Sequence, residues 1–263
     1  MSVITGGNAE NNINQAVRQI FGDYGDKVSV GAKNKSLTKF GVNPDITTVE
    51  EMVWSYGGVE TLPTSGNPID TISSSNTNDT QEVVIEGHTL AGSELTFVAQ
   101  TATLNGQNKV TLSTPLYRST RVYNNGSVPL EGDVYVYEDD TISNGVPQTD
   151  AKVHLKADVG NDQSLKAATS VSNSDYWLVT GVTLGVNRQS SRAVEFKIQV
   201  KEFGKVFRTR IFASCSSDTG SVYLPQDPLL IVPKNADVRV LATSTGTGTG
   251  VEATLHGRLA RVL

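Results

Sequence analysis

Histidines are the first residues to consider for chemistry, because an imidazole can act as a general base or bind a metal. The chain has three, His88, His154 and His256, and they fall in three strand-like segments far apart in the sequence. None has a second histidine or a carboxylate at the spacing of metal ligands. We therefore expect strand or core positions for all three, and no metal site.

Other candidates for catalysis are equally sparse. Cys215, the only cysteine, lies in "FASCSS" without a nearby histidine, which predicts a buried, unreactive thiol. No serine occupies a Gly-x-Ser-x-Gly turn. The glycine-rich run "TSTGTGTGVE" at 243–252 lacks the Gly-Lys-Ser/Thr ending of a phosphate loop and precedes a strand, which favours a hairpin loop.

Acidic residues leave two alternatives open. Glu138, Asp139, Asp140 and Asp150 lie in "YEDDTISNGVPQTD" and could offer oxygen ligands to Ca²⁺, but their spacing matches no calcium loop and favours a solvated turn. Carboxylates are also plentiful enough for a glycosidase pair, whose separation in space a sequence does not give. We predict no catalytic residue, no metal and no cofactor, and hence no enzyme.

Composition narrows the class of protein. The 263 residues carry a net charge of −5 without a stripe of Lys and Arg, so no nucleic-acid partner is expected. No apolar run approaches a membrane span, and the N-terminus lacks the pattern of a signal peptide. A low hydrophobic fraction of 37% with 24 glycines is typical of thin β-sandwiches joined by many turns.

Alternating polar and apolar residues begin at Ser73 and predict a first antiparallel sandwich over residues 67–160. Asn105-Gly106 and Asn125-Gly126 read as hairpin turns. In "DVYVYE", Val134 and Val136 form an aliphatic face, with tyrosines on the opposite face. The first half of the β-rich region should therefore fold as a separate module.

A second set of strands predicts another sandwich, jelly-roll-like, over residues 161–263. Residues 196–200 and 206–212 flank Gly204-Lys205 as a tight hairpin, and Pro225, Pro228 and Pro233 favour edges and corners. The predicted fold class is all-β: two antiparallel sandwich or jelly-roll modules preceded by a short helix and an extended arm.

Residues 1–66 are expected to form that helix and arm. Apolar residues recur at helical spacing within residues 8–22 and give a helix face of Ile13, Val17, Ile20 and Phe21. Such a short helix is marginal in water and needs a surface to lie on. Residues 31–66, with turn signals at Gly41 and Asn43-Pro44, read as irregular and extended.

The run "KSLTKFGVNPDITTVEEMVWSYGG" resembles an N-terminal segment of virion structural proteins from tailed bacteriophages, many of them marine or cyanobacterial. The shared pattern is Lys-Phe-Gly-x-Asn-x-Asp-Ile, then a Trp and a Gly-Gly, and it covers Lys39 to Gly58 here. Downstream segments, including "TATLNGQNKVTLSTPLYRSTRVYNNG" and "DPLLIVPKNADVRVLATST", are similar to later parts of the same family. The resemblance implies a structural particle protein without catalysis.

On this reading the arm docks on a neighbouring subunit through the anchors Phe40, Ile46, Trp54 and Tyr56, or it folds back on the first sandwich. The leading hypothesis is a capsid decoration (cement) protein of the virion, assembled in the host cytoplasm. It would form a homo-oligomer, with a trimer as the expected state. Helix and arm would grip the major capsid protein or other virion proteins, without nucleic acid or membrane.

The first alternative is a neck, tail or fibre component whose C-terminal module binds a partner or a host glycan; only Tyr223 and the loop 243–250 hint at this. A secreted-type carbohydrate-active enzyme is a third possibility, disfavoured by the missing site residues.

Overall fold

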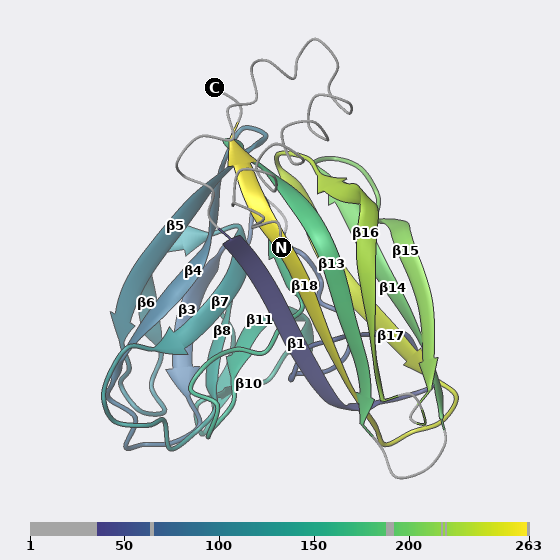
Figure 1. Cartoon of the computed structure of the whole chain (residues 1–263). Coiled ribbons are helices and arrows are strands. Elements are labelled where there is room, and N and C mark those ends of the chain that lie inside the picture. The colour runs from purple at the N-terminus through teal and green to yellow at the C-terminus, as the bar shows by residue number, and fades with distance from the viewer. Residues whose placement is uncertain (1–35, 64–65, 188–191, 217, 219, 262–263) are drawn as a thin grey trace, which may run out of the picture.

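The computed structural model describes residues 36–63, 66–187, 192–216, 218 and 220–261. The predicted helix at 8–22, with its face of Ile13, Val17, Ile20 and Phe21, lies outside these residues. Over the described residues the chain forms antiparallel sheets and one turn of 3₁₀ helix, η2 (Asp150–Lys152), which confirms the all-β class. Figure 1 shows two sandwiches that meet at one end and diverge at the other.

One sandwich has the strand order of a jelly roll. Its strands are β1 (Ser36–Ile46), β2 (Glu51–Met52), β12 (Ala168–Ser170), β13 (Asp175–Asn187), β14 (Ala193–Glu202), β15 (Arg208–Ser216), β16 (Ser221–Val232), β17 (Ala236–Ser244) and β18 (Thr249–Arg261). The two sheets run β1-β18-β13-β16 and β12-β17-β14-β15, and β2 lies beside β17. If β2 and β12 are counted as one interrupted strand, the eight strands form the two facing sheets of a jelly roll.

The other sandwich interrupts the jelly roll. The short strand β2 pairs with β17 at Leu241 and Ala242, and β12 pairs with the same strand three residues earlier, from Asp237 to Arg239. Between them the chain leaves at Trp54 and returns at Lys166, and these two residues form an isolated bridge. Residues 55–165 are thus an insertion within one edge strand of the jelly roll.

This connectivity corrects the predicted boundaries at 1–66 and 161–263. Residues 36–58 are not an arm, because β1 pairs with β18 over nearly its whole length and β2 belongs to the opposite sheet. Gly41 and Pro44 are turn signals, but β1 can contain them because it is an edge strand. Pro44 lies in a bulge between Asn43 and Ile46, where its missing backbone N–H removes no hydrogen bond between strands. Gly41 is needed there because the backbone of Ala167 lies against its Cα.

The inserted sandwich has a four-stranded sheet, β11-β8-β3-β6, facing a three-stranded sheet, β5-β4-β7. Its strands are β3 (Ile69–Ser74), β4 (Glu82–Ala91), β5 (Glu94–Thr103), β6 (Val110–Leu116), β7 (Arg118–Asn124), β8 (Val134–Glu138), the small pair β9 (Ile142–Ser143) and β10 (Val146–Pro147), and β11 (Val153–Ala157). The aliphatic face of β8 lies in the core, as predicted. Its tyrosines, Tyr135 and Tyr137, are buried on the opposite face.

Turn residues were easier to predict than strand pairing. Gly106 has the expected positive φ of 56°, but Asn105-Gly106 joins β5 to β6, which belong to different sheets. Asn125-Gly126 likewise lies between β7 of one sheet and β8 of the other. Of the predicted loop 243–250, only residues 245–248 lie outside strands, and they join β17 to β18 across the jelly roll. None of the three is a hairpin. The predicted β14–β15 hairpin around Gly204 is confirmed, as is an edge position for the strand that contains Pro225 and Pro228. These prolines do not bracket short strands as predicted, because β16 runs through both of them.

Candidate functional site at the junction of the two sandwiches

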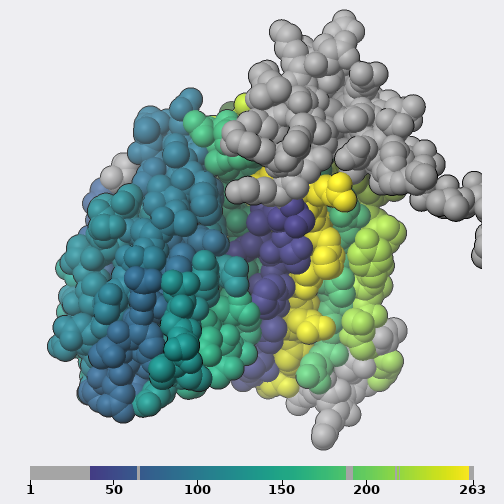
Figure 2. Space-filling model, turned by 60° about the vertical axis from the view of Figure 1, so that its left-hand side comes forward, coloured from purple at the N-terminus to yellow at the C-terminus, as the bar shows by residue number. Residues whose placement is uncertain are grey.

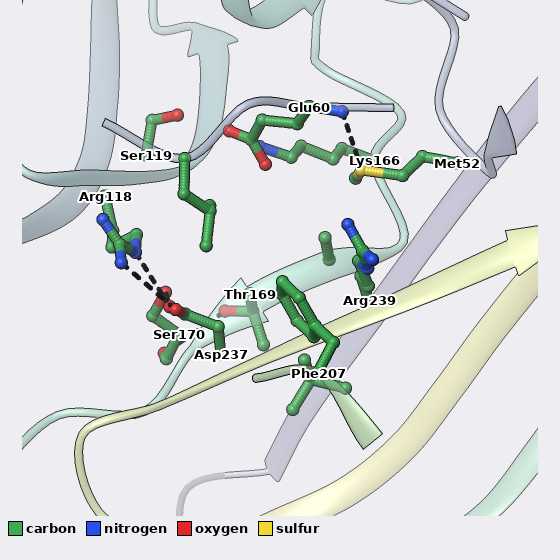
Figure 3. A pocket seen from close by; sticks show the side chains of 13 residues that line it. Met52, Glu60, Arg118, Ser119, Lys166, Thr169, Ser170, Phe207, Asp237 and Arg239 are labelled. Atoms are coloured by element: carbon green, nitrogen blue, oxygen red, sulfur yellow. Dashed lines mark hydrogen bonds and ion pairs between the residues drawn. The ribbon is translucent and has the colours of Figure 1, made fainter. Parts of the chain in front are cut away.

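The densest group of buried charges lies where the sandwiches meet, around a small cavity shown in Figure 3. The inserted sandwich contributes Arg118 and Ser119 from β7, and the jelly roll contributes Ser170, Asp237 and Arg239 from β12 and β17. The cavity holds about 20 Å³, which is room for roughly one water molecule. It is too small for a substrate.

Arg118 and Asp237 form an ion pair across the junction. The guanidinium Nε donates to Asp237 Oδ1 at 2.9 Å and Nη2 donates to Oδ2 at 3.2 Å, while Nη1 donates to the carbonyl of Tyr117. The hydroxyl of Ser170 donates to Asp237 Oδ1 at 2.6 Å. Both charged side chains are less than a tenth exposed. The two-pronged geometry suits a planar guanidinium and fixes the angle between the sandwiches.

A second buried network holds the two segments that connect the sandwiches. Lys166 Nζ, on the returning segment, donates to Glu60 Oε1 at 2.7 Å and to the carbonyl of His154 at 2.9 Å. The ring of His154 lies between two carboxylates, with Nδ1 3.0 Å from Glu60 Oε1 and Nε2 3.1 Å from Glu138 Oε1. Because Glu60 and Lys166 lie on the outgoing and returning segments, their pair clamps both crossings together.

Electrostatics favour the charged form of this carboxylate. Burial raises the pKa of Glu60, but the Lys166 ammonium and the contact with His154 outweigh it and lower the pKa to about 2. Glu60 is therefore ionised throughout the physiological range. Because its carboxylate is already paired with Lys166 and His154, Glu60 has little capacity left to act as a base.

Aromatic side chains support the same connecting segments. Trp54 makes an edge contact with Tyr56 at a centroid separation of 5.4 Å, and Tyr56 makes another with Tyr135 of β8 at 6.3 Å. Tyr56 also donates its hydroxyl to Asp150, and the Lys166 ammonium lies 5.3 Å from the Trp54 ring centre. The stretch "VWSYGG" thus attaches the inserted sandwich to the jelly roll.

A groove of about 1040 Å³ runs beside this junction. One wall is the N-terminal half of β1, with Leu37, Lys39 and Phe40; the other is the outer face of β4, β5 and β7, with His88 and Phe97. Figure 2 shows β1 along the boundary between the two sandwiches. Lys39 Nζ donates to the carbonyl of Thr120 across the groove at 2.5 Å.

Two basic side chains that line the groove, Lys39 and His88, have pKa values that burial lowers. Burial, helped by the positive charges of Lys166 and Arg121 and opposed by Glu86, lowers the pKa of Lys39 to about 7. Burial lowers the pKa of His88 to about 4, so His88 is neutral at pH 7. Its Nδ1 is buried without a hydrogen-bond partner in the described part of the chain.

The structure places the predicted arm anchors mainly inside the chain. Ile46 is fully buried in the jelly-roll core, and Trp54 is buried beside Met52 and Leu241. Tyr56 is partly buried at the junction. Only Phe40, 39% exposed, keeps a large apolar surface. Docking of this segment on a partner stays a prediction, and Phe40 is the anchor that is best placed for it.

The remaining candidates lie apart from one another. Cys215 is buried in the jelly roll, as predicted. His256 contacts Thr183 and the ring of Tyr223 on the outer face of the jelly roll, far from His154 in the fold. In the acidic segment, Asp140 accepts hydrogen bonds from the backbone of Gln148 and Thr149.

The described residues contain neither a candidate metal site nor a candidate transmembrane helix. No group of three or more His, Cys, Asp and Glu side chains there is arranged to hold a metal ion. Nor does that part of the chain contain a helix with the length and apolarity needed to cross a bilayer.

Sequence reasoning missed the junction itself. Arg118 and Asp237 are 119 residues apart, and Glu60 and Lys166 are 106 apart, so no local spacing links them. No local signal marks these residues: Arg118 lies among polar residues of β7, and Glu60 and Lys166 lie outside the strands. At the junction, Arg118 is paired with Asp237 and Lys166 with Glu60. These two ion pairs can hold the two sandwiches in one relative orientation.

Comparisons with known proteins are weak. No protein-family model and no curated protein matches the chain. Among solved structures, the VP2 subviral particle of infectious bursal disease virus is 12% identical over 94% of this chain and 80% of that chain, with a TM-score of 0.20. The structure of the Gt strain of the same virus is 12% identical over 95% of this chain and 82% of that chain, with a TM-score of 0.19. The structure of the Gx strain is 11% identical over 88% of this chain and 77% of that chain, with a TM-score of 0.20. Similarities of this size carry no inference about function.

Proposed function

We propose that this chain is a non-enzymatic structural protein of a tailed-bacteriophage virion, acting as a capsid decoration protein that stabilises the head by bridging capsomers. The observation that carries the proposal is the locked junction: a jelly roll and an inserted sandwich are fixed to each other by paired, buried charges. Its second support is the resemblance of Lys39 to Gly58 to virion proteins of that group.

Rigidity is the property that a bridging protein needs. If the link between the two sandwiches were flexible, it would lose conformational entropy when both sandwiches bind their partners, and this loss would weaken binding. In a rigid protein this entropy has already been lost during folding. Here Arg118–Asp237 fixes the bodies directly and Glu60–Lys166 fixes both connecting segments. Each sandwich can then contact a different capsomer at a set distance and angle.

Bridging would act through buried area. A standard interface buries roughly 1,600 Å² in total, so two footprints per subunit, repeated in a trimer, add substantially to contacts that oppose the pressure of packaged DNA. The partner is the major capsid protein or another virion protein, and Phe40 is the described residue that we propose as an apolar anchor of that contact.

Reconstitution tests the proposal. Purified protein is added to particles assembled without it, and bound protein and the temperature of DNA release are measured. We expect saturable binding to the head lattice and a higher release temperature. Binding without any gain in thermal resistance would refute a stabilising role.

One observation favours a second candidate function, that of a neck, tail or fibre component with a glycan-binding jelly roll. Tyr223 on β16 is 56% exposed, lies over the bare backbone of Gly181, and contacts the ring of His256 at 6.3 Å. An exposed aromatic beside hydroxyls and an imidazole could stack on a sugar ring. Loss of host-cell adsorption in Tyr223→Ala virions, with normal head stability, would favour this candidate over decoration.

A further inference from the structure

Two cations of the jelly roll share one aromatic ring beside the junction. The guanidinium carbon of Arg239, on β17, lies 3.8 Å from the ring centre of Phe207 (Figure 3). The ammonium of Lys201, on β14, lies 5.5 Å from the same ring centre. All three side chains are partly buried, so this cluster remains within reach of a partner.

The fold holds both positive charges at a cost. Burial is the largest cause that lowers the pKa of Lys201 and of Arg239. At Lys201 the carboxylate of Asp237 opposes this effect, and the guanidinium of Arg118 adds to it. A negative charge brought to the ring would relieve this cost.

Nearby carboxylates are already occupied. The three whose charges raise the pKa of Arg239 are each paired with another cation: Asp237 with Arg118, Glu60 with Lys166, and Glu50 with Lys197. Within the described residues, Arg239 donates one side-chain hydrogen bond, from Nε to the amide oxygen of Gln199 at 3.0 Å, and Lys201 Nζ donates none. Two positive charges are therefore left over once the ion pairs are counted.

We propose that Arg239 and Lys201 together bind the carboxylate of an acidic side chain on a partner protein. With Nε engaged by Gln199, the guanidinium keeps its two Nη groups for the two oxygens of a carboxylate. Lys201 adds a second positive charge on the same ring. The inference names the chemistry of the partner contact and rests on the proposed virion role only for the identity of that partner.

The surroundings favour a single carboxylate over an extended polyanion. A nucleic acid is held by many cations along its phosphate backbone. Here Glu195, near the start of β14, and Glu202, at its end, are both exposed, and the chain carries a net charge of −5. A row of phosphates would meet these negative charges, whereas one acidic side chain needs only the two cations.

A labelled peptide of six glutamates tests the site without any virion. Fluorescence anisotropy should show saturable binding to the wild-type protein, and Lys201→Met and Arg239→Met should each weaken it at least about tenfold. The matched control, Lys205→Met, removes one positive charge from an exposed position of the same hairpin and should leave the affinity nearly unchanged. No binding of the peptide, or an equal loss in Lys205→Met, would overturn the proposal.

Thermal unfolding separates a binding role from a structural one. Both methionine variants should unfold within about 2 °C of the wild-type Tm, because removing an uncompensated charge offsets the lost contact with the ring. A Tm that falls together with the affinity would mean a structural role and would overturn the proposal. Tighter binding of a 12-nucleotide single strand than of the glutamate peptide would replace the carboxylate with a phosphodiester.

Particles distinguish this inference from the proposed function. If the wild-type protein binds the head lattice and both methionine variants bind it equally well, the two cations are not the contact and the inference fails, while the virion role stands. If the wild-type protein binds the peptide but no particle, the virion role fails, while the carboxylate site stands.

Discussion

Removing one partner of the Arg118–Asp237 pair should strongly destabilise the protein. In Asp237→Ala, the Arg118 guanidinium stays buried at the junction without a counter-charge, and Ser170 loses its acceptor. Breaking a buried pair in this way typically costs about 3–5 kcal/mol. At about 2–4 °C per kcal/mol for a chain of this size, that corresponds to a fall in Tm of roughly 6–20 °C.

Thermal unfolding followed by circular dichroism measures this fall in Tm, and two further variants serve as controls. Asp139→Ala removes an exposed pair with Lys109 and should cost less than about 1 kcal/mol. The double variant Arg118→Met/Asp237→Leu removes both charges, so no charge is left unpaired, and it should be more stable than Asp237→Ala alone.

If Asp237→Ala lowered Tm no more than Asp139→Ala does, the Arg118 guanidinium would not need its buried counter-charge, contrary to this prediction. A double variant no more stable than Asp237→Ala would also contradict it, because removing the unpaired guanidinium should relieve the cost of its burial.

Three further predictions concern the junction and β1. Glu60 has a pKa of about 2 in the fold against an ordinary 4.5, so its contribution to folding stability is full above pH 4.5 and is lost as pH falls toward 2. In urea titrations, Glu60→Gln should therefore lower the free energy of unfolding by roughly 3 kcal/mol at pH 6 and by far less near pH 2.5. Lys39 has a pKa of about 7 against an ordinary 10.5, so its charge is unfavourable below pH 7 and this cost disappears as pH rises toward 10.5. Relative to wild type, Lys39→Met should therefore gain about 1–3 kcal/mol more at pH 6 than at pH 10, and an equal effect at both would contradict the burial argument. Gly41→Ala would place a Cβ against the backbone of Ala167 and should cost about 3 kcal/mol in thermal unfolding, whereas Gly66→Ala, with open space around it, should be nearly neutral.

The sequence identified many of the strands but not their partners. Alternation at Val134–Tyr137 correctly separated two faces of β8, and the glycine at 204 correctly marked a hairpin. Alternation describes one strand at a time, however, so it could not tell whether the chain after Asn105-Gly106 returns to the same sheet or crosses to the other.

β1 shows why a local rule can fail. Its Gly41 and Pro44 are strong turn signals in isolation, yet they are tolerated because β1 is an edge strand with a bulge and a close backbone neighbour. That neighbour, Ala167, is more than a hundred residues away. The junction charges were invisible for the same reason: their meaning depends on contacts that only the folded chain brings together.

The proposed decoration role makes this protein a repeated component of the virion head. The most direct measurement is its copy number in purified virions, determined by quantitative mass spectrometry against the major capsid protein. A decoration protein should give a ratio between one-to-one and one-to-a-few, which corresponds to a lattice of binding sites over the head. A handful of copies per particle would contradict it and would place the protein at the neck, tail or fibre.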